Sequence, residues 1–348
     1  MRLYNKYNKD LLKEQVESDN RNRVTISFYS YAKIGNPHLF RDHFYLLLDE
    51  VEVLGRIYVS YEGVNAQISV PEERLDDLRY ALNQITFLES CRLNKAIEDD
   101  GKSFYKLTIK VREKIVADGL NDKSFDVTNK GVHVNAKRFN ELADDENTVI
   151  IDMRNHYESE VGHFKGAVTP DVETFRESLP IIEDMLNDKK EDHNLLMYCT
   201  GGIRCEKASA YFKHKGFKNV FQLEGGIIEY TRQAREEGLE NKFVGKNFVF
   251  DDRLGERISE EIISKCHQCG TECDTHVNCA NDACHILFIQ CPECASKYGD
   301  CCSVKCKDFT ALPEEKRNEL KTKIEFNGTR FGKGRYKAIK KDEPLDLA

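Results

Sequence analysis

Several features are absent from this chain of 348 residues, and each absence narrows its class. No apolar run approaches the ~18 residues that a transmembrane helix needs, so we expect no membrane partner. The N-terminal residues lack the apolar segment of a secretory signal peptide, which predicts a cytoplasmic protein. The chain shows neither a glycine-rich dinucleotide fingerprint nor a motif of two histidines and a carboxylate for iron. Tryptophan is also absent, which decides little.

The chain has no strong excess of positive or of negative charge. The chain carries 52 basic and 60 acidic side chains, a net charge of −8, which argues against a histone-like surface. Residues 316–341 nevertheless hold ten basic and two acidic side chains, without apolar periodicity. We therefore expect residues 311–348 to form a flexible basic tail that follows phosphates. A disordered, merely solubilising end is the alternative.

Residues 1–120 have the pattern of a ferredoxin-like α+β domain. Strand patterns occupy 24–31, 56–61, 64–70 and 104–111, and helical patterns occupy 37–51 and the residues after Pro71. In that fold the helices cover one sheet face. The strand phases place aromatic, basic and amide side chains on the open face: Tyr29, Tyr31, Arg56, Tyr58, Asn65, Gln67, Lys106, Lys110 and Arg112. Such a face suits stacking on unpaired bases, and a solvated or domain-packed surface is the alternative.

The pattern changes after residues 113–131, which are typical of a linker. From 130 to 240, short apolar strands at 148–153, 194–199 and 219–223 alternate with helical segments. This order predicts a parallel α/β sheet.

A cysteine loop lies at the end of one of these strands. Cys199 ends the apolar run, and Thr200, Gly201, Gly202 and Ile203 lead to Arg204 and a helix. Backbone N–H groups and the helix dipole at such a turn favour a thiolate, and the glycines allow an anion nest. The arginine adds a positive charge. We therefore predict that Cys199 and Arg204 are catalytic and that Thr200–Ile203 bind substrate, with a buried structural cysteine as the alternative.

Two further segments identify the domain type. The motif D-x-R-x-x-x-E-x-x-x-G-H-x-x-G-A is matched at Asp152, Arg154, Glu158, Gly162, His163, Gly166 and Ala167. Together with residues 223–227 (LEGGI), it resembles the rhodanese domain. The resemblance implies that Cys199 carries a persulfide, whereas the motif's charged residues serve structural ion pairs. Cys205 is either a resolving cysteine or a packed small residue.

Ten of the thirteen cysteines fall between 266 and 306, in a module that we place at 245–310. Reduced cytosolic cysteines at this density indicate metal ligands rather than disulfides. Two C-x-x-C knuckles, Cys266/Cys269 and Cys291/Cys294, fit a structural zinc site. A second site is expected from Cys279, Cys284, Cys302 and Cys306, with Cys273, Cys301, His267, His276 and His285 as substitutes. An iron–sulfur cluster is the alternative.

The combined α/β and α+β multidomain architecture resembles one family over about residues 20–310. Residues 62–70, 151–157, 198–207 and 245–251 carry the likeness to the bacterial rhodanese-domain tRNA uridine hydroxylases, formerly an uncharacterised family. The resemblance implies an oxidoreductase that converts uridine 34 of tRNA to 5-hydroxyuridine with molecular oxygen as co-substrate. Its implied partner is tRNA and not DNA. From the strand phases above, we expect Tyr29, Tyr31, Lys106 and Lys110 to contact the RNA.

Two other functions remain open on the sequence alone. One is a plain rhodanese sulfurtransferase that passes persulfide sulfur to tRNA or a protein. The other is a zinc-dependent adaptor whose rhodanese domain has lost its chemistry. For the hydroxylase, one hypothesis is that Cys199 adds to C6 of uracil and makes C5 nucleophilic.

Overall fold

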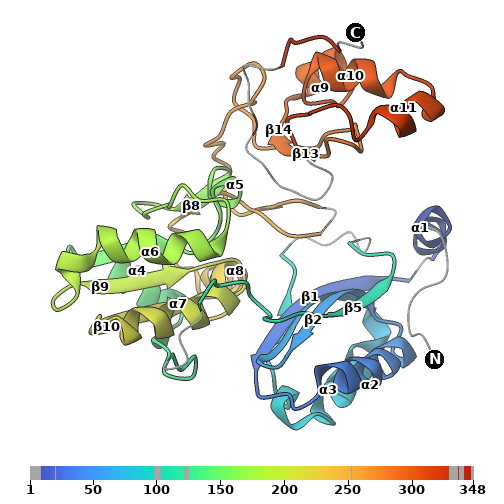
Figure 1. The fold of residues 1–348 in the computed structure, drawn as a ribbon. Helices are drawn as coiled ribbons and strands as arrows, with labels where there is room; N and C mark the ends of the chain where they lie inside the picture. The colour runs from blue at the N-terminus through green and yellow to red at the C-terminus, as the bar shows by residue number, and fades with distance from the viewer. Residues whose placement is uncertain are drawn as a thin grey trace.

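The computed structural model describes residues 9–19, 21–97, 103–120, 125–251, 253–328, 336 and 341–345. Figure 1 shows a blue N-terminal sheet with helices, a green-to-yellow central unit and an orange-to-red C-terminal module. Helix α1 (Lys9–Ser18) precedes the first sheet. In the part of the chain that is described, no helix has the length and apolar character required to cross a bilayer.

The N-terminal unit is a sheet with strand order β4-β1-β3-β2-β5. Its strands are β1 (Arg23–Tyr31), β2 (Leu54–Ser60), β3 (Gly63–Pro71), β4 (Asn94–Lys95) and β5 (Leu107–Val111). Its helical segments are α2 (Pro37–Glu50), η1 (Glu72–Arg74), α3 (Leu75–Asn83) and η2 (Thr86–Leu88). Figure 1 shows α2 and α3 together on one side of the sheet. The predicted ferredoxin-like class is confirmed.

One strand of that prediction is wrong. The fourth ferredoxin strand is β4, which runs antiparallel to β1 with Asn94 opposite Ser27. The segment predicted for that place, 104–111, instead contributes β5, which pairs in parallel with β2 and sets Lys110 beside Tyr58. A two-residue strand has too few positions to show an alternating pattern, so β4 is invisible to periodicity.

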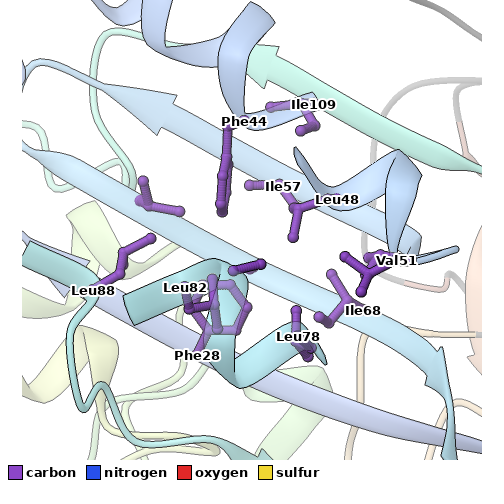
Figure 2. Close-up of a cluster of buried hydrophobic side chains, with 14 of the residues drawn as sticks. Phe28, Phe44, Leu48, Val51, Ile57, Ile68, Leu78, Leu82, Leu88 and Ile109 are labelled. Atoms are coloured by element: carbon purple, nitrogen blue, oxygen red, sulfur yellow. The ribbon is translucent and has the colours of Figure 1, made fainter. Parts of the chain in front are cut away.

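The N-terminal core lies between the sheet and its two helices. Figure 2 shows Phe44 and Leu48 of α2 facing Ile57 of β2, and Leu82 of α3 beside Phe28 of β1. Each of these side chains is at most 2% exposed, and burying one contributes about 1.5–3 kcal/mol. This core fixes the helices to one face and leaves the other face for the central unit.

The central unit contains a parallel sheet in the order β6-β10-β9-β7. The strands are β6 (Val132–Val134), β7 (Thr148–Asp152), β9 (Asn194–Tyr198) and β10 (Asn219–Leu223). The helical segments are α4 (Ala136–Ala143), α5 (His156–Ser159), α6 (Phe175–Met185), η3 (Asn187–Lys189), α7 (Ile203–His214) and α8 (Gly226–Glu237). A small sheet of β8 (Gly162–Phe164), β11 (Phe243–Asn247) and β12 (Glu256–Arg257) adjoins it. The predicted parallel α/β sheet is confirmed.

Over its described residues, the C-terminal module consists of a short hairpin and three short helices joined by irregular segments. The elements are β13 (His276–Asn278), β14 (Leu287–Ile289), α9 (Pro292–Tyr298), α10 (Val304–Thr310) and α11 (Glu314–Leu320).

The chain after residue 311 packs onto this module where it is described. The Gly328 N–H donates to Cys284 Sγ at 3.3 Å, and Tyr336 stacks on Phe288 with ring centroids 5.4 Å apart. These contacts show that charged segments can still contribute anchoring side chains, and the flexible basic tail expected at 311–348 stays a prediction. Residues 329–335, 337–340 and 346–348 lie outside the described residues.

Candidate active site and metal centres

Cys199 directly follows β9 and opens the loop that leads into α7. The loop turns at Gly202, whose φ of 96° lies in the left-handed region that favours glycine. The Gly202 N–H donates a hydrogen bond to Cys199 Sγ at 3.1 Å. Helix α7 begins one residue later, so the positive end of its dipole adds to this donor. The loop therefore has the local geometry expected of an anion nest.

The pKa of Cys199 is set by opposing effects. Burial by itself raises the pKa of this thiol. A hydrogen bond from the Cys205 thiol, the charge of Arg204 and the backbone N–H groups of both residues outweigh it, and lower the pKa to about 6. Cys205 shows the reverse, because burial and its hydrogen bond to Cys199 hold the pKa of its thiol well above the usual value. At neutral pH, Cys199 is thus a thiolate and Cys205 is a thiol that donates to it.

Arg204 is held in place by a buried carboxylate. Its Nη1 and Nη2 donate to the two oxygens of Glu158 at 2.6 and 2.8 Å. Burial raises the pKa of Glu158, but the Arg204 charge and its hydrogen bonds prevail, so the carboxyl pKa is lowered. Asp152 and Arg154 form a second, fully buried pair at 2.6 Å. The structural ion pairs expected of the rhodanese motif are present, and Glu158 fixes the charge beside the sulfur.

The L-x-G-G-I segment supports the cysteine loop from behind. The Ile227 N–H donates to the Cys199 carbonyl at 3.0 Å, and the Ile228 N–H donates to the Thr200 carbonyl at 3.3 Å. A Cβ on Gly226 would lie 2.5 Å from both carbonyl oxygens, so only glycine permits this approach. The first turn of α8 therefore fixes the position of Cys199.

Cys199 lines a cavity of about 480 Å³ between the central and N-terminal units. The cysteine loop forms one wall, and the face of the N-terminal sheet that the helices leave uncovered forms another. Side chains from that face that line the cavity are Thr25, Ser27, Tyr29, Arg56, Tyr58, Asn65 and Gln67. The face expected to carry aromatics and amides is thus one wall of a cavity rather than a fully open platform.

The structure brings together part of the predicted substrate-binding set. Of the predicted catalytic and substrate-binding residues, those that line the cavity are Tyr29, Cys199, Thr200, Gly201, Ile203 and Arg204. Gly202 contacts the sulfur within the loop. Tyr31 is a domain contact rather than a cavity wall, since its hydroxyl donates to the Ile203 carbonyl at 3.2 Å. Lys106 and Lys110 are exposed and are not among the described residues that line the cavity.

Polar contacts fix the two units against each other. The Tyr29 hydroxyl donates to Glu206 at 3.2 Å. Lys207 is 1% exposed, and its Nζ donates to Glu62 at 2.8 Å and to Asp118 at 2.6 Å. A buried ammonium with two carboxylates from different segments is costly to separate. The cavity is therefore a fixed feature of the joined units.

The sequence did not indicate several residues of the cavity. Asn94 comes from the undetected β4, and Glu256 and Arg253 come from the segment after β11. Phe250 lies in the segment 245–251, which resembled the hydroxylase family without suggesting a role, and its ring stands 5.9 Å from the Arg204 guanidinium carbon. No spacing rule links these positions to Cys199, because they meet only in three dimensions.

Eight cysteines form two compact clusters. One consists of Cys266, Cys269, Cys291 and Cys294, and the other of Cys279, Cys284, Cys302 and Cys306, and within each all sulfurs lie within 4.8 Å of one another. Sulfur separations of 3.6 Å (Cys269 to Cys291) and 3.7 Å (Cys284 to Cys302) occur among them. Each cluster can hold a metal ion, and the pairing left open by the sequence is resolved.

The donor set fits one tetrahedral ion per cluster. Zinc–sulfur bonds of about 2.3 Å in a tetrahedron place sulfurs about 3.8 Å apart, close to the separations found. A multi-iron cluster requires more widely spaced sulfurs and fits less well. Of the substitutes considered, Cys273 and Cys301 belong to neither cluster. His267 and His276 contact Glu160 instead, at 3.2 and 3.3 Å.

Fold and site together define a rhodanese-type protein with a reactive cysteine. Family models agree: the rhodanese-like domain matches residues 135–233, the UPF0176 acylphosphatase like domain matches 23–115, and the model described as rhodanase C-terminal matches 244–307.

Curated relatives extend over almost the whole chain. The tRNA uridine(34) hydroxylase of Pectobacterium atrosepticum is 52% identical over 96% of this chain and 94% of its own. That of Leptospira interrogans is 52% identical over 94% and 89%, and that of Photorhabdus laumondii is 50% identical over 96% and 95%. The chain belongs to the tRNA uridine(34) hydroxylase family.

Proposed function

We propose that this protein is an oxidoreductase that hydroxylates C5 of uridine at wobble position 34 of tRNA, giving 5-hydroxyuridine. The observation that carries this proposal is the cavity in which the Cys199 thiolate faces a sheet wall of aromatic and amide side chains. Its relatives' names supply the substrate and the position. The cavity volume of about 480 Å³ lies within the range of small-molecule sites and suits a single nucleoside.

A wobble base suits this cavity. The base is unpaired in the anticodon loop, so turning it into a cavity requires less energy than extracting a paired base. Tyr29 and Tyr58 line the wall, and aromatic rings are groups on which a pyrimidine can stack. We assign Lys106 and Lys110, both exposed, to phosphates of the RNA outside the cavity. These contacts make tRNA the partner, in the cytoplasm where tRNA is modified.

Cys199 acts as the nucleophile in this proposal. Its sulfur bonds to C6 of uracil, and the electron pair of the C5–C6 double bond moves toward C5 and O4, which makes C5 nucleophilic. C5 then takes one oxygen atom, loses its proton, and the C6–S bond breaks to release the thiolate. With molecular oxygen as oxidant, the second oxygen atom leaves as water, and two electrons come from a thiol-class donor: C–H + O₂ + 2 RSH gives C–OH + H₂O + RSSR.

We assign zinc to the two cysteine clusters, one ion in each. Four thiolates close the coordination sphere, so these ions have a structural role. The module has few apolar side chains of its own, and metal binding contributes to its folding free energy.

Nucleoside analysis of cellular tRNA tests the function. Cells that lack the gene are supplied with the wild-type protein, with Cys199→Ser, or with Cys91→Ser as a matched control outside the cavity. We expect 5-hydroxyuridine with the wild type and Cys91→Ser and none with Cys199→Ser. Normal 5-hydroxyuridine with Cys199→Ser refutes the nucleophilic role.

The same measurement separates hydroxylation from sulfur transfer. A rhodanese that passes sulfur to tRNA replaces an oxygen of uridine by sulfur, which changes the nucleoside mass differently. Gene-dependent thiouridine without 5-hydroxyuridine would overturn the proposed reaction and favour the sulfurtransferase.

A further inference from the structure

Two buried oxygen atoms in the cavity wall have no partner. Asn94 is 5% exposed and Glu256 is 0% exposed, and both line the cavity with Cys199. Among the described residues, neither Asn94 Oδ1 nor Glu256 Oε2 has a hydrogen-bond partner. Buried acceptors are normally satisfied, so two unsatisfied ones beside a reactive thiolate indicate a ligand that carries complementary polar groups.

Asn94 stands next to the cysteine loop. It lies opposite Ser27 in the β4–β1 pair, so both side chains project from the same face of the sheet. The Asn94 Nδ2 and Ser27 Oγ atoms are each 3.8 Å from the position that a Cβ on Gly201 would take. The amide is thus held at the edge of the loop that presents Cys199.

Glu256 is hydrogen-bonded to the segment that carries Asn94. Its Oε1 accepts from the Ile97 N–H at 3.0 Å and from Arg253 Nη1 at 2.6 Å, which leaves Oε2 free. Ile97 lies three positions beyond Asn94, so one short segment connects the two groups. Burial raises the pKa of the Glu256 carboxyl, although the charge and the hydrogen bond of Arg253 oppose this rise.

We propose that Asn94, supported by Glu256, recognises the N3–H and carbonyl edge of uracil and selects this base over cytosine. The inference rests on the proposed function for the identity of the substrate. Uracil presents an N–H donor between two carbonyl acceptors. An asparagine amide offers an acceptor to N3–H and a donor to one carbonyl. Glu256 holds the segment that carries this amide, because its Oε1 accepts from the Ile97 N–H.

Cytosine presents the opposite pattern at two of these positions. Its N3 is an acceptor and its exocyclic N4 is a donor, so Asn94 Oδ1 would face a lone pair. A site built around a substrate N–H discriminates strongly against an analogue that lacks it, because its own buried groups then stay unpaired. Asn94 is therefore a specificity residue, distinct from the nucleophile.

Binding measurements without oxygen test this inference independently of turnover. The full-length protein is titrated with anticodon stem-loops that carry uridine, 3-methyluridine or cytidine at position 34. We expect the wild type to bind the uridine loop at least about tenfold more tightly than either of the others, the loss that follows from one missing hydrogen bond. Equal affinity for uridine and 3-methyluridine would overturn the proposal.

Variants identify the residue responsible. Asn94→Ala should weaken uridine binding and reduce the preference over 3-methyluridine to about twofold or less. Asn94→Asp keeps the shape of the side chain and offers acceptors to the cytosine N4 donor, so it should shift the preference toward cytidine by about tenfold. Asn187→Ala, at an exposed position on η3, is the control with unchanged preference. An unchanged base preference in both Asn94 variants would overturn the assignment.

The outcome is separable from that for the proposed function. If the wild type prefers uridine but forms no 5-hydroxyuridine with oxygen present, base recognition stands and the reaction fails. If 5-hydroxyuridine forms from uridine and 3-methyluridine at equal rates, the reaction stands and the role of Asn94 fails. A purely structural role of Asn94 would lower stability and binding of all three loops alike.

Discussion

Replacing Cys205 by alanine tests what makes Cys199 a thiolate. The Cys205 thiol donates a hydrogen bond to Cys199, and this bond is the foremost of the effects that lower the pKa of Cys199 to about 6. Cys205→Ala removes the donor without altering any charge, and it leaves Arg204 and the Gly202 N–H in place.

The expected shift follows from the strength of one charge-assisted hydrogen bond. Such bonds contribute about 1.5–3 kcal/mol, and a weak thiol donor belongs at the lower end, so the pKa rises by about one unit at 1.36 kcal/mol per unit. The thiolate is lost as the pH falls through the pKa, so the variant loses it at a higher pH. At pH 6 the thiolate fraction then falls from about one half to about one tenth.

Alkylation with iodoacetamide measures this fraction at the residue itself. Trypsin cuts after Lys190 and Arg204, so Cys199 and Cys205 fall on separate peptides and mass spectrometry follows Cys199 alone. We expect Cys205→Ala to react about fivefold more slowly than the wild type at pH 6 and nearly equally at pH 8.5. Cys205→Ser keeps a donor and is the matched control with a rate profile close to that of the wild type.

Identical pH profiles for the wild type and Cys205→Ala would refute this reasoning. The backbone N–H donors and the charge of Arg204 would then suffice to keep the pKa of Cys199 low. A profile of Cys205→Ser that matches Cys205→Ala would instead assign the effect to packing around the sulfur rather than to a donated hydrogen bond.

Three further expectations concern stability and metal content. Glu158→Gln should lower the free energy of unfolding by about 3–5 kcal/mol in urea, because Arg204 stays buried without its partner, and adding Arg204→Met should recover part of the loss. Metal analysis of purified protein should find about two zinc ions per chain and about one in Cys279→Ser, whereas Cys273→Ser, outside both clusters, should retain two. Lys207→Met should speed tryptic cleavage in the connector after β5, because two carboxylates lose the buried cation that joins the units, and an unchanged rate would contradict this.

The sequence predicts the parts of this protein that depend on local order. The turn at Gly202 and the arginine after it follow from a strand, two glycines and a helix start, all within a few residues. Alternation along β1 placed Tyr29 on the correct face, because a strand fixes the side of each residue. The knuckle spacing of Cys266 and Cys269 likewise reflects a local turn.

The features that the sequence predicted wrongly or did not predict depend on contacts between residues far apart in the chain. The strand at Leu107–Val111 has a clear pattern, but only its neighbours decide which sheet edge it joins. Asn94 and Glu256 are ordinary polar residues in sequence, and their unsatisfied oxygens are recognisable only once the cavity encloses them. Tyr336 belongs to a charged segment whose composition suggests disorder, yet its ring stacks on Phe288.

The walls of the cavity come from two different domains, and this affects how the protein can evolve. Tyr29 lines the cavity and is hydrogen-bonded to Glu206 of α7, which lies 177 positions away in the chain. Cys199 is encoded in one domain, and the sheet face that forms another wall of its cavity is encoded in a different one. Substitutions on β1, β3 or β4 can therefore alter which molecule enters, while the cysteine loop and its chemistry are inherited intact. Selection and reactivity can evolve, or be engineered, as separate traits.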